Sequence, residues 1–160
     1  MRLKRTARPL LVASMLVLTN DRFTFTVPDS VVAQCSALRD APPSDEGPVP
    51  LPNVTASNIA RIVEYHVRVS ELNQKDASPR TVHEWKSGFF ASMARPELYA
   101  VMEAANYLGA VDMLEDSCQY VSGLIRGMSS EQIRELFMMP VDWTAEEARA
   151  ARAEFAWALK

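Results

Sequence analysis

The chain has 160 residues, of which 48% are hydrophobic and 23% charged, and its net charge is −3. This length fits one domain, or one domain with an appended helical piece, and this composition excludes an intrinsically disordered protein. Four basic residues and no acidic residue precede Asp21, so the rest of the chain carries a charge of −7. Such an acidic body lacks the clustered Lys and Arg that bind nucleic acid.

The N-terminal stretch allows two interpretations. Residues 1–8 are basic and residues 9–18 are apolar, which imitates a short secretory signal or an organellar presequence. The apolar run is too short to span a membrane, and no small-x-small cleavage site follows it before Asp21. We therefore favour the other interpretation, in which residues 15–19 form a strand and residues 1–14 are a basic extension.

The next segments predict a small sheet. Residues 15–19 and 23–27 are rich in β-branched and aromatic residues and flank a tight turn at Asn20-Asp21, which indicates a hairpin. Phe23, Phe25 and Val27 alternate with threonines and should face the core. A short helix should follow from Pro28 to Leu38. Four prolines make residues 41–50 a loop, and residues 49–54 are expected to add a strand at the edge of the sheet.

Helical periodicity begins after Thr55, the expected N-cap, and apolar residues recur at spacings of three and four through Val67. The polar residues 71–81 predict a flexible loop. Further helices are expected at residues 82–90, 96–108, 112–127, 129–137 and 144–159, the last two opened by capping boxes. The predicted fold class is therefore α+β: a small sheet covered by helices, followed by three C-terminal helices.

The sequence shows no constellation for catalysis. It has no glycine-rich phosphate loop, and its two histidines have no His or Cys partner at ligand spacing. His66 lies on an apolar helix face and is interpreted as a core or boundary histidine with its hydrogen bonds satisfied. Cys35 and Cys118 are interpreted as buried, reduced thiols. We expect no enzyme activity, no metal, no cofactor and no small-molecule substrate.

Two aromatic residues point to protein partners instead. Trp157 lies about 200° around the last helix from Phe155, away from the apolar stripe that should pack, and such a tryptophan often anchors an interface. Tyr107 lies opposite Leu98 on its helix, with Asn106 beside it. The alternative for Trp157 is that it packs in the core late in the helix. For Tyr107 we weight partner binding and core packing equally.

Several motifs, in order and at matching spacing from about Met15 to Lys160, resemble the Skp-type adaptor subunit of SCF (Skp–cullin–F-box) ubiquitin ligases, as in a divergent plant-type member. They are Pro48-Val-Pro-Leu-Pro-Asn-Val54, Val63-Glu-Tyr-His66, Glu84-Trp85 with Phe89-Phe90, Ala104-Ala-Asn-Tyr-Leu108, Met113-Leu114 with Cys118, Ile125-Arg-Gly127, Glu131-Gln-Ile-Arg134 with Phe137, and Thr144-x-Glu-Glu147 with Phe155-Ala-Trp157.

This resemblance implies a BTB/POZ-like domain at residues 15–112 and an F-box-binding helical region at residues 113–160. It implies a nuclear and cytoplasmic adaptor that joins F-box proteins to a cullin in ubiquitin-dependent degradation, with no nucleic-acid or membrane partner. The implied cullin-binding residues are Tyr99, Asn106 and Tyr107. The implied F-box-binding residues are Cys118, Val121, Ile125, Ile133, Phe137, Phe155 and Trp157.

The chain also departs from the family pattern. Glu103 replaces an aliphatic residue beside the expected cullin-binding positions, and Gly109-Ala-Val111 replaces a more polar turn. Arg22 replaces a turn glycine, and Lys86 and Gly88 replace acidic residues. Because an unpaired charge at an interface is costly, Glu103 supports an alternative: a scaffold that binds or sequesters F-box proteins without binding cullin.

Overall fold

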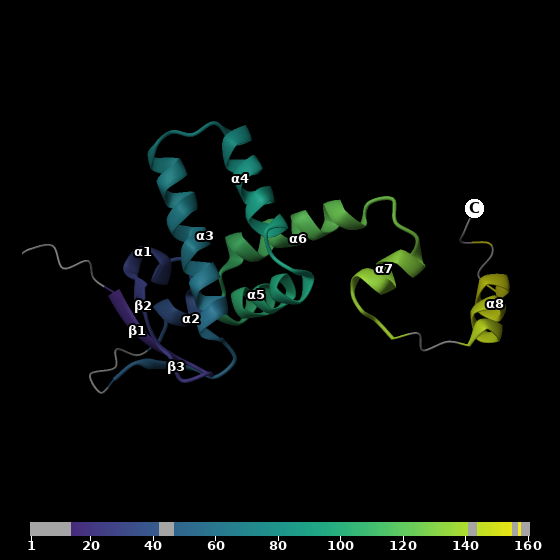
Figure 1. Cartoon of the computed structure of the whole chain (residues 1–160), viewed down its shortest axis with the longest axis horizontal. Helices are drawn as coiled ribbons and strands as arrows, with labels where there is room; N and C mark the ends of the chain where they lie inside the picture. Colours follow the sequence, from purple (N-terminus) through teal and green to yellow (C-terminus); the bar gives the residue numbers. More distant parts are fainter. Residues whose placement is uncertain (1–13, 42–46, 141–143, 155–156, 158–160) are drawn as a thin grey trace, which may run out of the picture. The chain divides into compact units, whose positions relative to one another are not determined.

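The computed structural model of the chain describes residues 14–41, 47–140, 144–154 and 157. They belong to two compact units, Met1–Val121 and Ser122–Lys160. Figure 1 labels the helices and strands of both. The first unit combines a three-stranded sheet with helices, which confirms the predicted α+β class. Its elements in chain order are β1 (Ser14–Thr19), β2 (Thr24–Pro28), α1 (Asp29–Val32), α2 (Ser36–Arg39), β3 (Val49–Leu51), α3 (Ala56–Gln74), α4 (Pro79–Ala91), α5 (Arg95–Leu108) and α6 (Val111–Ile125), whose last turn enters the second unit.

The predicted hairpin and the predicted edge strand are both present. In the sheet order β2-β1-β3, β1 pairs antiparallel with β2 and parallel with β3. Val17 and Val27 are fully buried on the inner face. The prediction for Phe23 was wrong, because this residue precedes β2 and its side chain is 61% exposed. Its backbone is nevertheless anchored: the Phe23 N–H donates to Thr19 Oγ1 at 3.1 Å.

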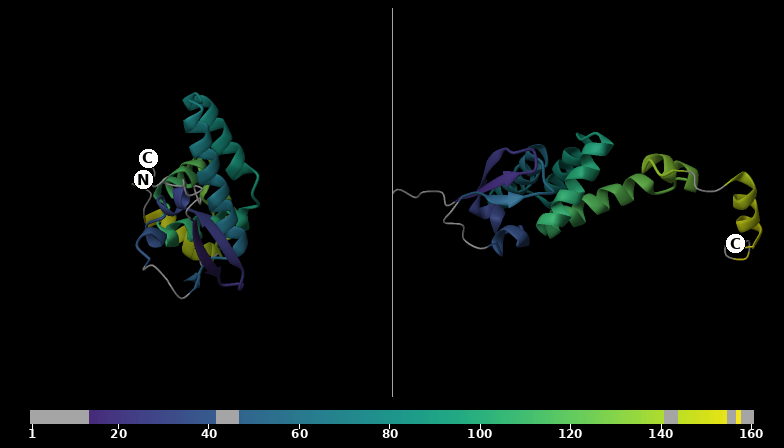
Figure 2. Two further views of the ribbon diagram at one scale, coloured as in Figure 1. Left: turned by 90° about the vertical axis from the view of Figure 1, so that its left-hand side faces the viewer. Right: turned by 90° about the horizontal axis from the view of Figure 1, so that it is seen from below.

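The predicted helix over residues 28–38 is instead two one-turn helices, α1 and α2, which contact the sheet and α5 respectively. α3 packs against α1, β2, α5 and α4 and is the central helix of this unit (Figures 1 and 2). Its N-terminus is capped as predicted, since Thr55 Oγ1 accepts a hydrogen bond from the Asn58 N–H at 3.2 Å. Asp21 in the hairpin turn also accepts from the Ala56 N–H, at 3.1 Å.

The loop predicted over residues 71–81 is much shorter, because α3 continues to Gln74 and α4 begins at Pro79. The polar residues of the last α3 turns lie on its solvent side, where Arg68 pairs with Glu71 at 2.8 Å, while Leu72 is buried. Polar composition therefore marked an exposed helix face rather than a loop. Ser78 caps α4 by accepting from the Thr81 N–H at 3.1 Å.

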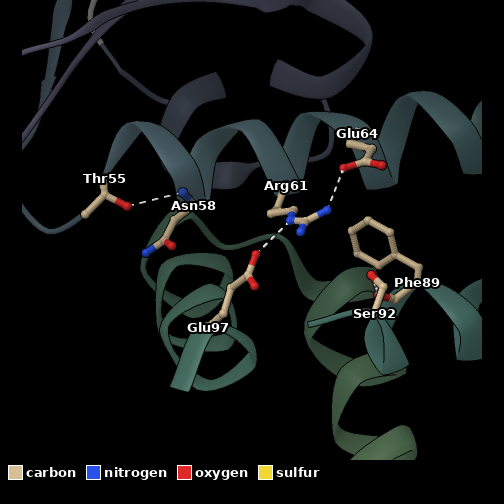
Figure 3. Close-up of polar contacts among 7 residues, drawn as sticks. All are labelled: Thr55, Asn58, Arg61, Glu64, Phe89, Ser92 and Glu97. Carbon is tan, nitrogen blue, oxygen red and sulfur yellow. Dashed lines mark hydrogen bonds and ion pairs between the residues drawn. The ribbon is translucent and has the colours of Figure 1, made fainter. Parts of the chain in front are cut away.

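α3 and α5 are joined by polar contacts as well as by packing. Arg61 lies between two carboxylates, with Nε 2.9 Å from Glu97 Oε1 on α5 and Nη1 3.2 Å from Glu64 Oε2 on α3 (Figure 3). The Asn58 side-chain amide donates to the Ala100 carbonyl of α5 at 3.3 Å. α5 ends at Gly109, as predicted, and this residue has the left-handed φ of 67° that favours glycine.

The second unit contains α7 (Ser130–Leu136) and α8 (Ala145–Glu154). Both predicted capping boxes are confirmed: the Gln132 N–H donates to Ser129 Oγ at 3.3 Å, and the Glu147 N–H donates to Thr144 Oγ1 at 3.3 Å. An exposed ion pair of 2.8 Å joins Arg152 of α8 to Glu131 of α7. No residue of α8 between 145 and 154 is buried, so little of this helix is covered by its own chain.

Candidate partner-binding surfaces

The outer face of α5 carries the residues expected at a cullin interface. Tyr99, Glu103, Asn106 and Tyr107 lie at positions i, i+4, i+7 and i+8, which share one face of a helix. We call these four residues the α5 surface. Asn106 and Glu103 are exposed, Tyr107 is 40% exposed and Tyr99 is half-buried. The opposite face of α5 packs in the core, where its buried residues are Leu98, Val101, Ala104, Ala105 and Leu108.

One departure from the family pattern, Glu103, is part of this surface, and another, Val111, follows it in the chain. Glu103 is exposed, and it forms no ion pair with any residue in the described part of the chain. Val111, the first residue of α6, is 64% exposed. The α5 surface is therefore a mixed aromatic and polar patch that contains the Glu103 carboxylate.

The expected F-box residues of α6 differ in accessibility. The prediction of a buried thiol at Cys118 was wrong: this side chain is free and exposed, whereas Cys35 is free and buried. Cys118 lies on the solvent side of α6 because Met113, Ser117 and Val121 occupy the core-facing side. Val121 is only 8% exposed and thus contributes mainly to the fold, while Ile125 is half-buried. Burial raises the pKa of the Cys35 thiol to about 11, so this cysteine stays protonated.

In the second unit, Ile133 and Phe137 are half-buried on α7 and at its C-cap. Trp157 is 76% exposed, as expected for an aromatic residue that does not pack as core. Phe155 lies outside the described residues. Four further apolar side chains, not assigned to a partner from the sequence, are also exposed: Leu124, Met128, Met138 and Met139. The signal for the last three was the high methionine content of residues 128–139. Methionines of this kind suit adaptable protein-binding surfaces.

A polar network joins three helices of the first unit, α3, α4 and α6. Asp116 of α6 accepts a hydrogen bond from Tyr65 Oη of α3, and its Oδ2 lies 2.6 Å from Lys86 Nζ of α4. Burial, reinforced by the Asp116 carboxylate, raises the pKa of the Tyr65 hydroxyl, so it remains a hydrogen-bond donor. Sequence reasoning could not find this network, because its members are far apart in the chain and share no motif.

A cavity of about 790 Å³ adjoins the network and is lined by polar residues that include His66, Lys86, Asp112 and Asp116. His66 is buried, as predicted, but its Nε2 has no hydrogen-bond partner among the described residues, so the prediction of a satisfied histidine was wrong. No group of three His, Cys, Asp or Glu side chains within the described ranges could hold a metal ion. The described helices also include none that is long and apolar enough to cross a membrane.

The sequence is similar to known proteins of one family. The family model described as Skp1 family, dimerisation domain, matches residues 112–158. SKP1-like protein 3 of Arabidopsis thaliana is 31% identical over 157 residues, which cover 91% of this chain and 96% of that protein. SKP1-like protein 9 of Arabidopsis thaliana is 29% identical, over 91% of this chain and 97% of that protein. Suppressor of kinetochore protein 1 of Schizosaccharomyces pombe is also 29% identical, over 92% of this chain and 98% of that protein.

Proposed function

The chain belongs to the Skp1 family, and from this premise we propose that it is a non-enzymatic adaptor of an SCF ubiquitin ligase. In this role residues 15–112 are a BTB/POZ-like domain that binds a cullin, and residues 113–160 bind F-box substrate receptors. The observation that supports it best is the 76% exposure of Trp157, a residue of the matched region that is large, aromatic and not packed as core.

An adaptor needs two separate surfaces, and the described residues offer two. The α5 surface belongs to the first unit, and Ile133, Phe137 and Trp157 belong to the second. Aromatic residues that fill a partner's pocket dominate protein interfaces, often at 2 kcal/mol or more each, about thirtyfold in affinity. Tyr107 and Trp157 are therefore the residues whose removal should separate the two activities.

The test is a binding assay with one F-box protein and one cullin N-terminal domain, measured separately. We expect Trp157→Ala to lower F-box affinity at least about tenfold, with unchanged cullin affinity and a melting temperature only a few degrees lower. We expect Tyr107→Ala to lower cullin affinity alone. If Trp157→Ala unfolds the protein but leaves F-box affinity normal in the folded fraction, the assignment of Trp157 fails. Reversed effects of the two variants would contradict both assignments.

Glu103 favours a second candidate, a scaffold that binds F-box proteins without a cullin. Its carboxylate, which pairs with no residue in the described part of the chain, would lose water at a cullin interface unless the partner supplied a cation. If the charge opposes binding, Glu103→Leu should strengthen cullin affinity, and Glu103→Gln should do so in part. No measurable cullin affinity in either the wild type or Glu103→Leu would favour the scaffold.

For either role we propose a nuclear and cytoplasmic distribution, which imaging of the tagged full-length chain would test. Export of the chain, or cleavage near residue 20, would contradict this proposal and favour a targeting segment at the N-terminus.

A further inference from the structure

Asp116 connects α6 to two other helices through one carboxylate. The hydroxyl of Tyr65 on α3 donates to Oδ2 of Asp116, and the ammonium group of Lys86 on α4 lies 2.6 Å from the same oxygen. The side chains of Lys86 and Asp116 are only 25% and 21% exposed, so water screens this pair less than it screens the surface pairs. Asp116 is thus the polar attachment of α6 to the α3–α4 pair.

The position of Asp116 around the axis of α6 can be compared with the positions of the expected F-box residues. Met113, Ser117 and Val121 form the buried face of α6. With roughly 100° of rotation per residue, Cys118 and Ile125 lie about 180–200° from Asp116. The side chain that holds α6 and the side chains expected to meet an F-box therefore lie on opposite flanks of one helix. Any rotation of α6 about its axis moves both flanks together.

The buried side chains of α6 fix part of that rotation, and Asp116 adds a polar contact on one flank. One turn after Asp116, Tyr120 contacts Phe90 with ring centroids 5.8 Å apart and the rings tilted by 34°, a contact that tolerates small rotations. A hydrogen bond is directional by comparison, and the Lys86–Asp116 pair adds charge attraction at a close distance. The two donors on Asp116 come from different helices, so they fix both the rotation of α6 and its position along its axis.

We propose that Asp116 is a positioning residue for F-box binding. Held by Lys86 and Tyr65, it sets the orientation in which Cys118 and Ile125 are presented to the partner. This inference rests on the proposed adaptor function and names the internal contacts that support its F-box-binding face. It assigns to Lys86 a structural partner 30 positions away that no local sequence pattern indicates.

The experiment is a double-mutant cycle in the full chain, with Lys86→Met, Asp116→Asn and the two combined. We expect each single variant to weaken F-box affinity by about threefold to tenfold. The double variant should bind the F-box protein about as weakly as the single variant with the lower affinity, because the two residues act as a unit. Cullin affinity should stay unchanged. Hydrogen exchange of residues 111–121 should become faster, and the reversed pair K86D/D116K should regain part of the F-box affinity.

A matched control comes from α4. Arg80 and Glu84 form an ion pair of 2.7 Å that is exposed, with side-chain exposures of 87% and 62%. Among the described residues, no hydrogen bond or ion pair joins it to α6. R80M/E84Q removes the same kind of charge pair and should leave both affinities and the exchange of residues 111–121 unchanged. Should the Asp116 variants fail to fold, Tyr65→Phe removes one donor without changing a charge and should give a smaller loss of the same kind.

Additive losses in the cycle would overturn the proposal, as would equal losses of F-box and cullin affinity, which indicate general destabilisation. Faster exchange in α6 with unchanged F-box affinity would also overturn it. A wild-type chain that binds no F-box protein would instead contradict the adaptor function itself, so the two failures are distinguishable.

Discussion

Burial lowers the pKa of His66 below its ordinary value, and the negative charge of Asp112 opposes this effect without cancelling it. The buried imidazole, 8% exposed, therefore stays neutral in the folded protein at a pH where the unfolded chain binds a proton. Its contribution to the free energy of unfolding is fully present above the unfolded pKa of about 6.5 and is lost as the pH falls below that value.

His66→Phe should remove this pH dependence. The phenyl ring is of similar size and can keep the edge-to-face contact with Tyr65, whose ring centroid lies 5.2 Å away. It also removes Nε2, the polar atom without a hydrogen-bond partner among the described residues. We expect the free energy of unfolding, measured by urea denaturation, to fall less between pH 7 and pH 5 in this variant than in the wild type. The exposed His83 of α4 provides the control, since His83→Gln should retain the wild-type slope.

The end of α5 depends on one residue, its C-cap Gly109. Gly109 has φ 67°, and a Cβ placed on it would lie 1.9 Å from the Ser36 hydroxyl of α2. Gly109→Ala therefore combines an unfavourable left-handed backbone with a side-chain clash, and we expect it to lower the free energy of unfolding by roughly 2 kcal/mol or more. Ser36→Ala in the same chain should recover only the part due to the clash.

The control for Gly109 is Gly88, inside α4, where an added Cβ meets nothing within 4 Å. Gly88→Ala should raise the free energy of unfolding by roughly 0.5–1 kcal/mol, because alanine is the better helix former. Chemical denaturation of both variants checks the pair. A Gly109→Ala protein as stable as the wild type would show that the α2–α5 junction adjusts freely.

At the same scale, local signals predicted the elements and long-range packing decided the rest. Capping residues and periodicity placed the starts of α3, α7 and α8, because these depend on neighbours within one turn. The extension of α3 to Gln74 was missed because an exposed helix face has the same composition as a loop. The exposure of Cys118 and the Lys86–Asp116 pair depend on which helices meet, and no periodicity within one segment contains that information.

At the scale of the molecule, the two proposed activities use different side chains, although Cys118 and Val121 of the expected F-box set lie in the same compact unit as the α5 surface. The α5 surface belongs to Met1–Val121, and Ile133, Phe137 and Trp157 belong to Ser122–Lys160. Coupling between two binding sites needs an element with two arrangements that both ligands bias, and the two surfaces share no side chain. An adaptor of this construction should join its partners without making either bind more tightly.

We therefore expect the dissociation constant for a cullin N-terminal domain to change by less than about twofold, or about 0.4 kcal/mol, when the chain is saturated with an F-box protein. Isothermal titration of the free and F-box-bound chain measures this directly. Tyr107→Ala should reduce cullin affinity by the same factor in both states, since its loss concerns only the α5 surface. A tenfold change on F-box binding would show that α6, which begins next to the α5 surface and carries Cys118 and Ile125, transmits the occupancy of one surface to the other.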